Sequence, residues 1–148
     1  MDAEPTETVS PDCAGRKPVG ELLAEAGLRP TRQRLALGQL LFGGGDERHV
    51  TAERLYEEAL AANLSVSLAT VYNALHQFTQ AGLLREIAVD GERVYFDTNT
   101  AEHHHFLLED DGELYDIAGA NLSVSNLPQP PDGLRVARVD VIVRLRRA

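Results

Sequence analysis

The sequence predicts an α+β fold built from two units, and three observations carry this prediction. Apolar residues recur at helical spacing between Val19 and Gln80. Two alternating apolar segments then flank the dipeptide Asp90-Gly91, which is a strong hairpin signal. After residue 96, short apolar segments typical of strands replace the helical spacing. We therefore expect a disordered tail over residues 1–17, a first domain over 18–96 and a small α/β domain over 97–148.

Three helices are expected before residue 62, and each has a start or stop signal. The first begins at Val19 and stops at Gly27, a residue type that suits the position after a helix end. Thr31 is the expected N-cap of the second helix, over residues 32–42, and three glycines end that helix. Thr51 is the expected N-cap of the third, whose apolar face consists of Ala52, Leu55, Tyr56, Ala59 and Leu60.

The fourth helix, opening at Ser65 or Ser67, has two chemically distinct faces. Its apolar face consists of Leu68, Val71, Tyr72, Leu75 and Phe78, and its polar face of Ser67, Thr70, Asn73, Gln77 and Gln80. No acidic residue lies between Ser67 and Ala81, although the whole chain has a net charge of −9. Hydroxyl and amide side chains of this kind read base edges in DNA, and Asn and Gln suit adenine. The alternative is an ordinary amphipathic helix with neutral exposed residues.

Helices followed by a two-stranded hairpin are typical of a winged helix, a DNA-binding unit. The hairpin carries Arg93 near its tip, where contact with a phosphate or the minor groove is geometrically available. Further cationic side chains stand at the entry to the second helix: Arg29, Arg32 and Arg34. Because residues 18–96 contain ten acidic and seven basic residues, a DNA site there depends on a local arginine cluster.

The second domain is expected to contain three strands, over residues 103–108, 112–117 and 136–145. A sheet of about three strands is marginal alone, so we expect it to pair with a second copy of the chain. Residues 97–134 contain eight acidic residues and no Lys or Arg, whereas five arginines follow residue 134. Those arginines, acting across a dimer, or a bound cation would relieve the repulsion within this acidic block. The alternative is a solvated acidic face.

Three consecutive histidines divide between two faces if their segment is a strand, because side chains alternate along it. His103 and His105 then share one face, and His104 points to the other. We expect His104 to form a mixed nitrogen and oxygen metal site with His49, Asp97 and Asp116. The other pair then lies near the surface, able to ligate an iron centre or a haem edge. The alternative is a solvated triplet.

Several classes of protein are excluded by what the sequence lacks. The single cysteine, Cys13, rules out an internal disulfide and a CxxC zinc site. The longest uncharged apolar run is too short to span a membrane and the acidic start is unlike a signal peptide, so we expect a cytoplasmic protein with no membrane partner. No nucleophile arrangement, HExxH pair or phosphate-cradling loop is present, so we expect no enzyme, with a metal-dependent enzyme as a remote alternative.

Four segments carry a family resemblance: Leu28 to Arg34, His49 to Tyr56, Ser67 to Leu75, and the histidine triplet. In this order they resemble the ferric uptake regulator family, and within it most closely the iron response regulator branch, over about residues 19–147. The resemblance implies an N-terminal winged-helix DNA-binding domain, a C-terminal α/β dimerisation domain and a homodimer. It also implies binding to AT-rich palindromic operators in double-stranded DNA under the control of iron.

The resemblance also implies which residues contact DNA. By position, the fourth helix is the recognition helix, with Thr70, Tyr72 and Asn73 at the DNA. Members of the family usually have a basic residue where Asn73 stands, which suggests a different operator preference. The complete set of DNA-contacting candidates is Arg29, Arg32, Arg34, Ser67, Thr70, Tyr72, Asn73, Gln77 and Arg93.

Two ligand sites are implied in the same way. Relatives have an interdomain metal site, matched here by His49, Asp97, His104 and Asp116, although Phe106 stands where they often have His. The family's second site lacks a completing histidine in the last strand. The iron response regulator branch is associated with haem, for which the implied ligands are His103, His104 and His105. Cys13 is followed by Ala14, so a Cys-Pro haem motif is absent.

These implications lead to a regulatory hypothesis with two forms. In the first, a dimer holds DNA when iron is scarce and releases it when haem occupies the histidine triplet. In the alternative, Fe²⁺ or Mn²⁺, with Zn²⁺ as a third candidate ion, occupies the interdomain site and promotes DNA binding, as in a metal-corepressed repressor.

Overall fold

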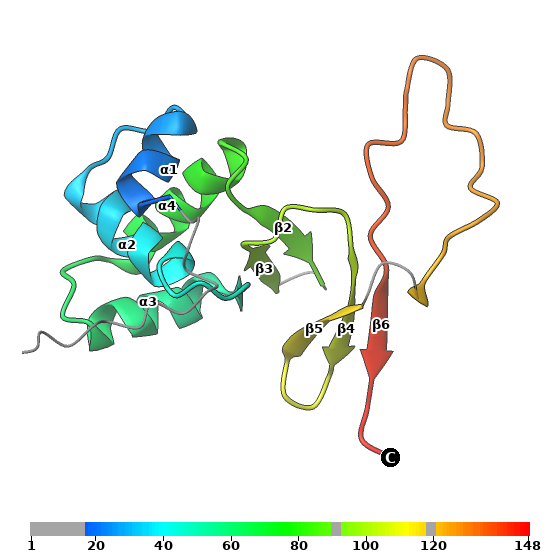
Figure 1. Ribbon diagram of the computed structural model, residues 1–148. Helices are drawn as coiled ribbons and strands as arrows, with labels where there is room; N and C mark the ends of the chain where they lie inside the picture. The colour runs from blue at the N-terminus through cyan, green and yellow to red at the C-terminus, as the bar shows by residue number, and fades with distance from the viewer. Residues whose placement is uncertain (1–16, 90–92, 118–120) are drawn as a thin grey trace, which may run out of the picture.

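The computed structural model describes residues 17–89, 93–117 and 121–148 of the chain. Figure 1 shows four helices packed together in the N-terminal part, followed by two small sheets toward the C-terminus. The expected tail, except Lys17, lies outside the described residues, as do Cys13 and the Asp90-Gly91 turn. In the part of the chain that the structure describes, no helix has the length and hydropathy needed to cross a membrane.

The four helices begin where the sequence predicts. They are α1 (Val19–Glu25), α2 (Arg32–Phe42), α3 (Ala52–Ala61) and α4 (Leu68–Gln80). At the last three, the N-cap hydroxyl of Thr31, Thr51 or Ser67 accepts a hydrogen bond from the backbone N–H three residues further on. Gly27 adopts a φ of 80° just after α1, as expected of a helix-ending glycine. These caps confirm the predicted helix starts, with Ser67 rather than Ser65 opening α4.

The helices enclose one core, but two residues expected to face it do not. The buried stripe of α4 is Val71, Ala74, Leu75 and Phe78. Tyr72 is 36% exposed because it lies one residue, about 100° around the helix, from that stripe. Leu60 is likewise one residue past the buried Ala59 of α3 and is 49% exposed. One margin of the predicted stripe on α3 and on α4 is therefore left open to solvent, whereas Tyr56 and Leu68 still pack against the core.

The first sheet joins the expected hairpin to a third strand that was not expected. Its strands are β1 (His49–Val50), β2 (Arg85–Ala88) and β3 (Val94–Asp97), in the antiparallel order β1-β3-β2. Strand β1 has two residues, too few to show an alternating pattern in the sequence. Strand β3 ends at Asp97, one residue beyond the expected domain boundary, and the register places Asp97 opposite both His49 and Arg85.

The second sheet is smaller than expected, and the described residues after Asp97 contain no α-helix of their own. Its strands are β4 (His104–Leu108), β5 (Glu113–Ile117) and β6 (Ile142–Leu145), in the order β5-β4-β6. Strand β6 pairs with β4 in parallel and is four residues long, so the strand expected over 136–145 is mostly absent. Residues 121–141 contain no α-helix, which corrects the α/β expectation. Pro128, Pro130 and Pro131 lack the N–H groups that a helix interior requires.

Three arginines tie the C-terminal segment to the first sheet. Arg85 of β2, 6% exposed, forms an ion pair with Asp140 and donates to the Ala101 carbonyl at 3.0 Å. Arg138 and Arg144 donate to backbone carbonyls of the 86–89 segment at 2.8 and 2.7 Å. The arginines nearest the C-terminus pair with Glu109 and Asp111 of their own chain, where pairing across a dimer was expected.

Candidate functional site

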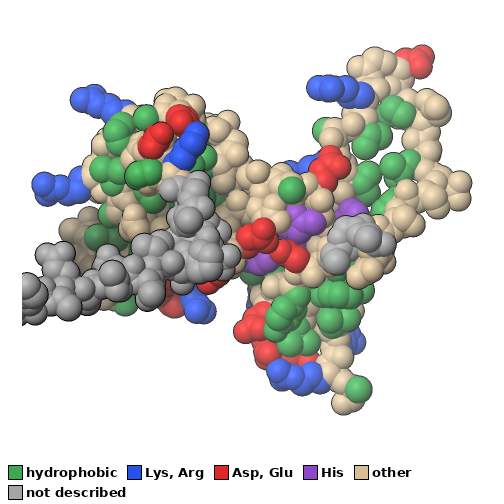
Figure 2. All heavy atoms as spheres, in the orientation of Figure 1, with side chains coloured by type: hydrophobic (Ala, Val, Ile, Leu, Met, Phe, Trp, Pro, Cys, Tyr) green, Lys and Arg blue, Asp and Glu red, His purple; other side chains and the backbone are tan. Residues whose placement is uncertain are grey.

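Five potential metal ligands meet between the two sheets. His49 comes from β1, Asp97 from the end of β3, His103 and His105 from β4 and the residue before it, and Asp116 from β5. One ligand atom from each lies within 4.8 Å of all the others. Figure 2 shows histidine side chains gathered at this junction beside acidic ones. Residues from both parts of the chain therefore contribute to one cluster.

The three imidazoles share two carboxylate oxygens. Asp97 Oδ2 lies 3.1, 2.8 and 3.2 Å from the Nε2 atoms of His49, His103 and His105. Asp116 Oδ1 lies 2.8, 3.2 and 3.3 Å from the same three nitrogens. Ligands bound about 2.1 Å from a metal ion at right angles to one another are about 3 Å apart. The donor spacing therefore matches that of ligands arranged around a single ion.

Strand register and one backbone carbonyl orient the ligands. His49 pairs with Asp97 across β1 and β3, and His105 pairs with Asp116 across β4 and β5. The Nδ1 atom of His103 lies 2.6 Å from the Ala101 carbonyl oxygen. Because that oxygen only accepts, Nδ1 carries the hydrogen in the neutral ring and the Nε2 lone pair faces the cluster. His103 is thus held in the tautomer that a metal ion requires.

The electrostatics of the cluster favour a cation. Burial opposes ionisation of Asp97, but the hydrogen bond from His105 and the nearby His49 outweigh it, so the pKa of Asp97 lies well below its usual range. Burial lowers the pKa of His49, but attraction to Asp97 and Asp116 outweighs it and raises that pKa. The buried Nε2 atom of His49 has no hydrogen bond of good geometry among the described residues. Imidazole nitrogens and carboxylate oxygens together suit Fe²⁺, Mn²⁺ or Zn²⁺.

The expected division of the histidines between two faces is confirmed, but the expected assignment of the faces is wrong. His103 and His105, expected near the surface, are largely buried in the cluster, and His105 is 2% exposed. His104, expected in the metal set, points the opposite way, and its Nδ1 atom accepts a hydrogen bond from the Val141 N–H. Side chains alternate between the two faces of a strand, but this alternation does not show which face of β4 lies toward β1, which is distant in the sequence.

The arginines at the start of α2 do not all remain available for a ligand. Arg29 and Arg32 are exposed. Arg34 donates to Gln77 Oε1 on α4 through Nε at 3.1 Å and through a terminal nitrogen at 2.9 Å. The Arg93 guanidinium lies against Gly112, in the turn between β4 and β5 of the second sheet. Two of the four arginine candidates therefore have contacts within the chain.

The candidates on α4 lie at its N-terminus and on its exposed side. The hydroxyl of Ser67 caps the helix and lies 2.9 Å from that of Thr70. Asn73 is exposed. The Tyr72 hydroxyl donates to Glu53 Oε1 on α3 at 2.6 Å. Glu53 is a neighbour of this surface that the sequence reasoning missed, because nothing in the local pattern of α3 distinguishes it from other exposed glutamates.

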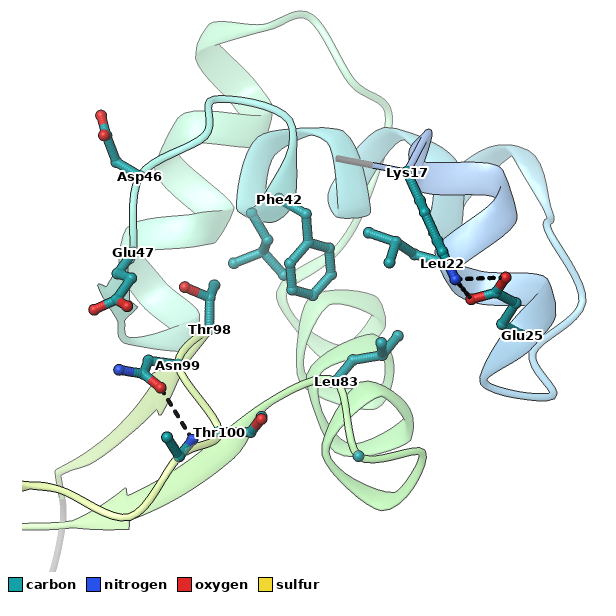
Figure 3. Close-up of a pocket in the computed structure, with 13 residues that line it drawn as sticks. Lys17, Leu22, Glu25, Phe42, Asp46, Glu47, Leu83, Thr98, Asn99 and Thr100 are labelled. Carbon is teal, nitrogen blue, oxygen red and sulfur yellow. Dashed lines mark hydrogen bonds and ion pairs between the residues drawn. The ribbon is translucent and has the colours of Figure 1, made fainter. Parts of the chain in front are cut away.

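A separate cavity of about 670 Å³ lies between the helices and the chain that follows β3. Figure 3 shows its apolar side chains, Leu22, Phe42 and Leu83, facing Thr98, Asn99 and Thr100. No residue of the five-ligand cluster lines it. The cavity and the cluster are therefore distinct features.

The fold and the site together define an α+β protein with a candidate transition-metal centre between a helical unit and a small sheet. A profile of the ferric uptake regulator family matches residues 25–131. The chain belongs to this family.

Known relatives are similar over most of the chain. The ferric uptake regulation protein of Bordetella parapertussis is 34% identical over 101 residues, which are 68% of this chain and 72% of that protein. A peroxide-responsive repressor of Staphylococcus aureus is 33% identical over 95 residues, 64% of this chain and 63% of that one. The solved structure of the Pseudomonas aeruginosa ferric uptake regulator with manganese superposes with a TM-score of 0.65 and 27% sequence identity. The match covers 86% of this chain and 96% of the Pseudomonas chain.

Proposed function

We propose that this protein is a homodimeric transcription regulator that binds double-stranded DNA when a divalent cation occupies the five-ligand cluster. The observation that carries the proposal is the convergence of three histidines and two aspartates from both parts of the chain. Family membership supports a regulatory rather than a catalytic role. A regulator of this kind acts on DNA in the cytoplasm.

Residues 18–97 are proposed to form the winged-helix DNA-binding domain, with α4 as its recognition helix. In support, α4 has no acidic residue in its first turn, and Asn73 on its exposed side can pair with adenine in the major groove. Arg29 and Arg32 supply exposed positive charge for phosphates near the start of α2. Two such domains related by a dimer axis would bind a palindromic, AT-rich operator.

The cluster is proposed to hold Fe²⁺, Mn²⁺ or Zn²⁺ through His49, Asp97, His103, His105 and Asp116. A bound cation supplies positive charge that offsets the two carboxylates and favours one arrangement of the two sheets. His49 and Asp97 fix the first sheet to the site, while the other three fix the second sheet. The angle between these units determines the spacing of two DNA-binding domains in a dimer, so ion occupancy controls operator affinity.

Pairing with a second copy is proposed to involve the second sheet and the crossover leading to β6. Figure 1 shows this crossover as an open loop projecting from the sheet. It carries large apolar side chains that are at least 40% exposed: Val124, Leu127, Leu134 and Val136. Apolar side chains clustered at this exposure are typical of a protein interface. Their burial against a second copy would remove this apolar surface from water.

Haem, which the resemblance to the iron response regulator branch implies, is the second candidate signal. His104 lines a cavity of about 410 Å³ whose walls are partly apolar, from Val124, Leu127 and Val136, and partly charged, from Glu102 and Arg138. The apolar part suits a macrocycle. Because His104 Nδ1 accepts from Val141, the hydrogen of the neutral ring is on Nε2. Ligation of iron through Nε2 therefore requires the Val141 hydrogen bond to break. This cost is why we place the divalent cation first.

A DNA-binding titration separates the two signals. Fluorescence anisotropy on an AT-rich palindromic duplex would be measured with EDTA, with Mn²⁺ and with haem. We expect Mn²⁺ to tighten binding in wild type and in His104→Ala, and to have no effect in His105→Ala. Binding that is indifferent to Mn²⁺ and Fe²⁺ would contradict the proposal. Saturable haem binding that releases the duplex, and that His104→Ala abolishes, would transfer the assignment to haem.

A further inference from the structure

At each margin of the exposed side of α4, one residue forms a side-chain hydrogen bond with another helix. At 100° per residue, Tyr72 and Gln77 flank this side, and Asn73 lies between them. Glu53 of α3 accepts from the Tyr72 hydroxyl at 2.6 Å. Arg34 of α2 donates twice to the Gln77 side chain, at 3.1 and 2.9 Å. Residues outside α4 therefore determine which hydrogen-bonding groups Tyr72 and Gln77 present.

Each contact fixes the hydrogen-bonding role of its α4 residue. A phenol has one hydrogen, and Glu53 accepts it, so the outward lone pair of the Tyr72 oxygen is left as an acceptor. A guanidinium has only donors, so the Gln77 oxygen faces Arg34 and its NH₂ group is left as a donor. One margin of the surface thus presents an acceptor and the other a donor.

The negative charge of the Glu53 carboxylate also opposes the approach of DNA phosphates to this surface. It lies beside a helix that has no acid in its first turn, on a surface proposed to approach phosphates. A negative charge there weakens sequence-independent attraction to DNA. Its hydrogen bond to Tyr72 strengthens once DNA excludes water, because the local dielectric constant falls. The charge therefore disfavours non-specific duplex while the hydrogen bond acts at the specific site.

We propose that Glu53 is a specificity-determining positioning residue: it holds Tyr72 with the phenol oxygen as an acceptor, so that the protein selects adenine or cytosine over guanine or thymine at one operator position. In the major groove only adenine and cytosine present an exocyclic amino group as a donor. This inference rests on the proposed DNA-binding function. Glu53 acts through Tyr72, which makes the contact with the base.

The test uses the full chain with Mn²⁺ and a panel of duplexes. Wild-type protein first enriches bound sequences from a random library, and each base pair of the enriched site is then replaced by the other three. Anisotropy gives the dissociation constants. In wild type we expect one position where adenine and cytosine bind about tenfold more tightly than guanine and thymine. In Glu53→Ala this preference falls below about twofold while preferences at other positions persist.

Three further variants separate hydrogen bonding from charge. Glu57→Ala removes another exposed glutamate from α3, one with no hydrogen bond or ion pair in the described residues, and should keep the preference. Glu53→Gln keeps an acceptor for the Tyr72 hydroxyl and should also keep it, whereas Tyr72→Phe should lose it. A thermal unfolding curve checks that each variant is folded.

The outcomes distinguish this inference from the function on which it rests. A wild-type preference in Glu53→Ala, or an equal loss in Glu57→Ala, would overturn the role of Glu53 while leaving DNA binding in place. A library from which the wild-type protein enriches no sequence would overturn the proposed function and this inference with it.

Discussion

Replacing Asp140 by Ala should destabilise the protein because it removes the carboxylate that neutralises a buried guanidinium. Arg85 is 6% exposed and is paired with Asp140. After the substitution Arg85 would retain the Ala101 carbonyl, while its Nε atom is already without a hydrogen bond in the described part of the chain. Breaking a buried ion pair costs about 3–5 kcal/mol.

The expected loss of stability for Asp140→Ala is smaller than this, because the ion pair is only partly buried. The Asp140 side chain is 34% exposed, and water entering the vacated space would solvate part of the guanidinium. Arg138 also loses its 2.8 Å contact with Asp140, but that pair is exposed and contributes little. We therefore expect a loss of about 2 kcal/mol in the free energy of unfolding, or about 6 °C in Tm for a chain of this length.

Urea unfolding followed by far-ultraviolet circular dichroism measures this loss, with EDTA present in every sample. Asp132→Ala is the matched control, because Asp132 is exposed and has no ion pair or side-chain hydrogen bond in the described residues. A loss below about 0.5 kcal/mol in Asp140→Ala, or the same loss in both variants, would refute the reasoning that Arg85 depends on this carboxylate.

Three further outcomes are expected. Because the folded-state pKa of His49 is raised, its stabilising contribution is complete below pH 6.5 and is lost as the pH rises through the raised pKa. The urea midpoint of the metal-free protein should therefore be lower at pH 8 than at pH 6, and an unchanged midpoint would contradict this. Asp97→Asn should abolish the rise in Tm that Mn²⁺ produces, as a thermal shift assay would detect, whereas retention of the full rise would exclude Asp97 as a ligand. Thr31→Ala removes the N-cap of α2 and should cost about 1 kcal/mol in urea unfolding, while no loss would mean that the cap contributes nothing.

Local chemistry in the sequence predicted the helical part of the fold well. Thr31, Thr51 and Gly27 mark helix ends by interactions with neighbouring residues, and the structure has helix ends at those positions. The β2–β3 hairpin follows equally from local alternation. Features that depend on distant residues were less predictable. Strand β1 is defined by its pairing with two residues of β3, and β6 by its pairing with four residues of β4, so both depend on residues distant in the sequence.

The candidate metal site was predicted in part for the same reason. His49, Asp97 and Asp116 were placed together correctly, on the resemblance and on their chemistry. The choice of His104 over His103 and His105 required knowledge of which face of β4 meets the first sheet. A strand segment of five residues with partly apolar positions on both faces does not contain that information.

The carbonyl oxygen of Ala101 connects the Arg85–Asp140 ion pair to the candidate metal site. It accepts from Arg85 at 3.0 Å and lies 2.6 Å from Nδ1 of His103. One atom thus joins the arginine that anchors the C-terminal segment to a ligand of the candidate metal centre. Thermodynamic linkage then requires reciprocity: if ion binding at His103 strengthens the Arg85–Asp140 pair, loss of that pair must weaken ion binding by the same factor. Asp140 would therefore act as an allosteric residue without touching the ion.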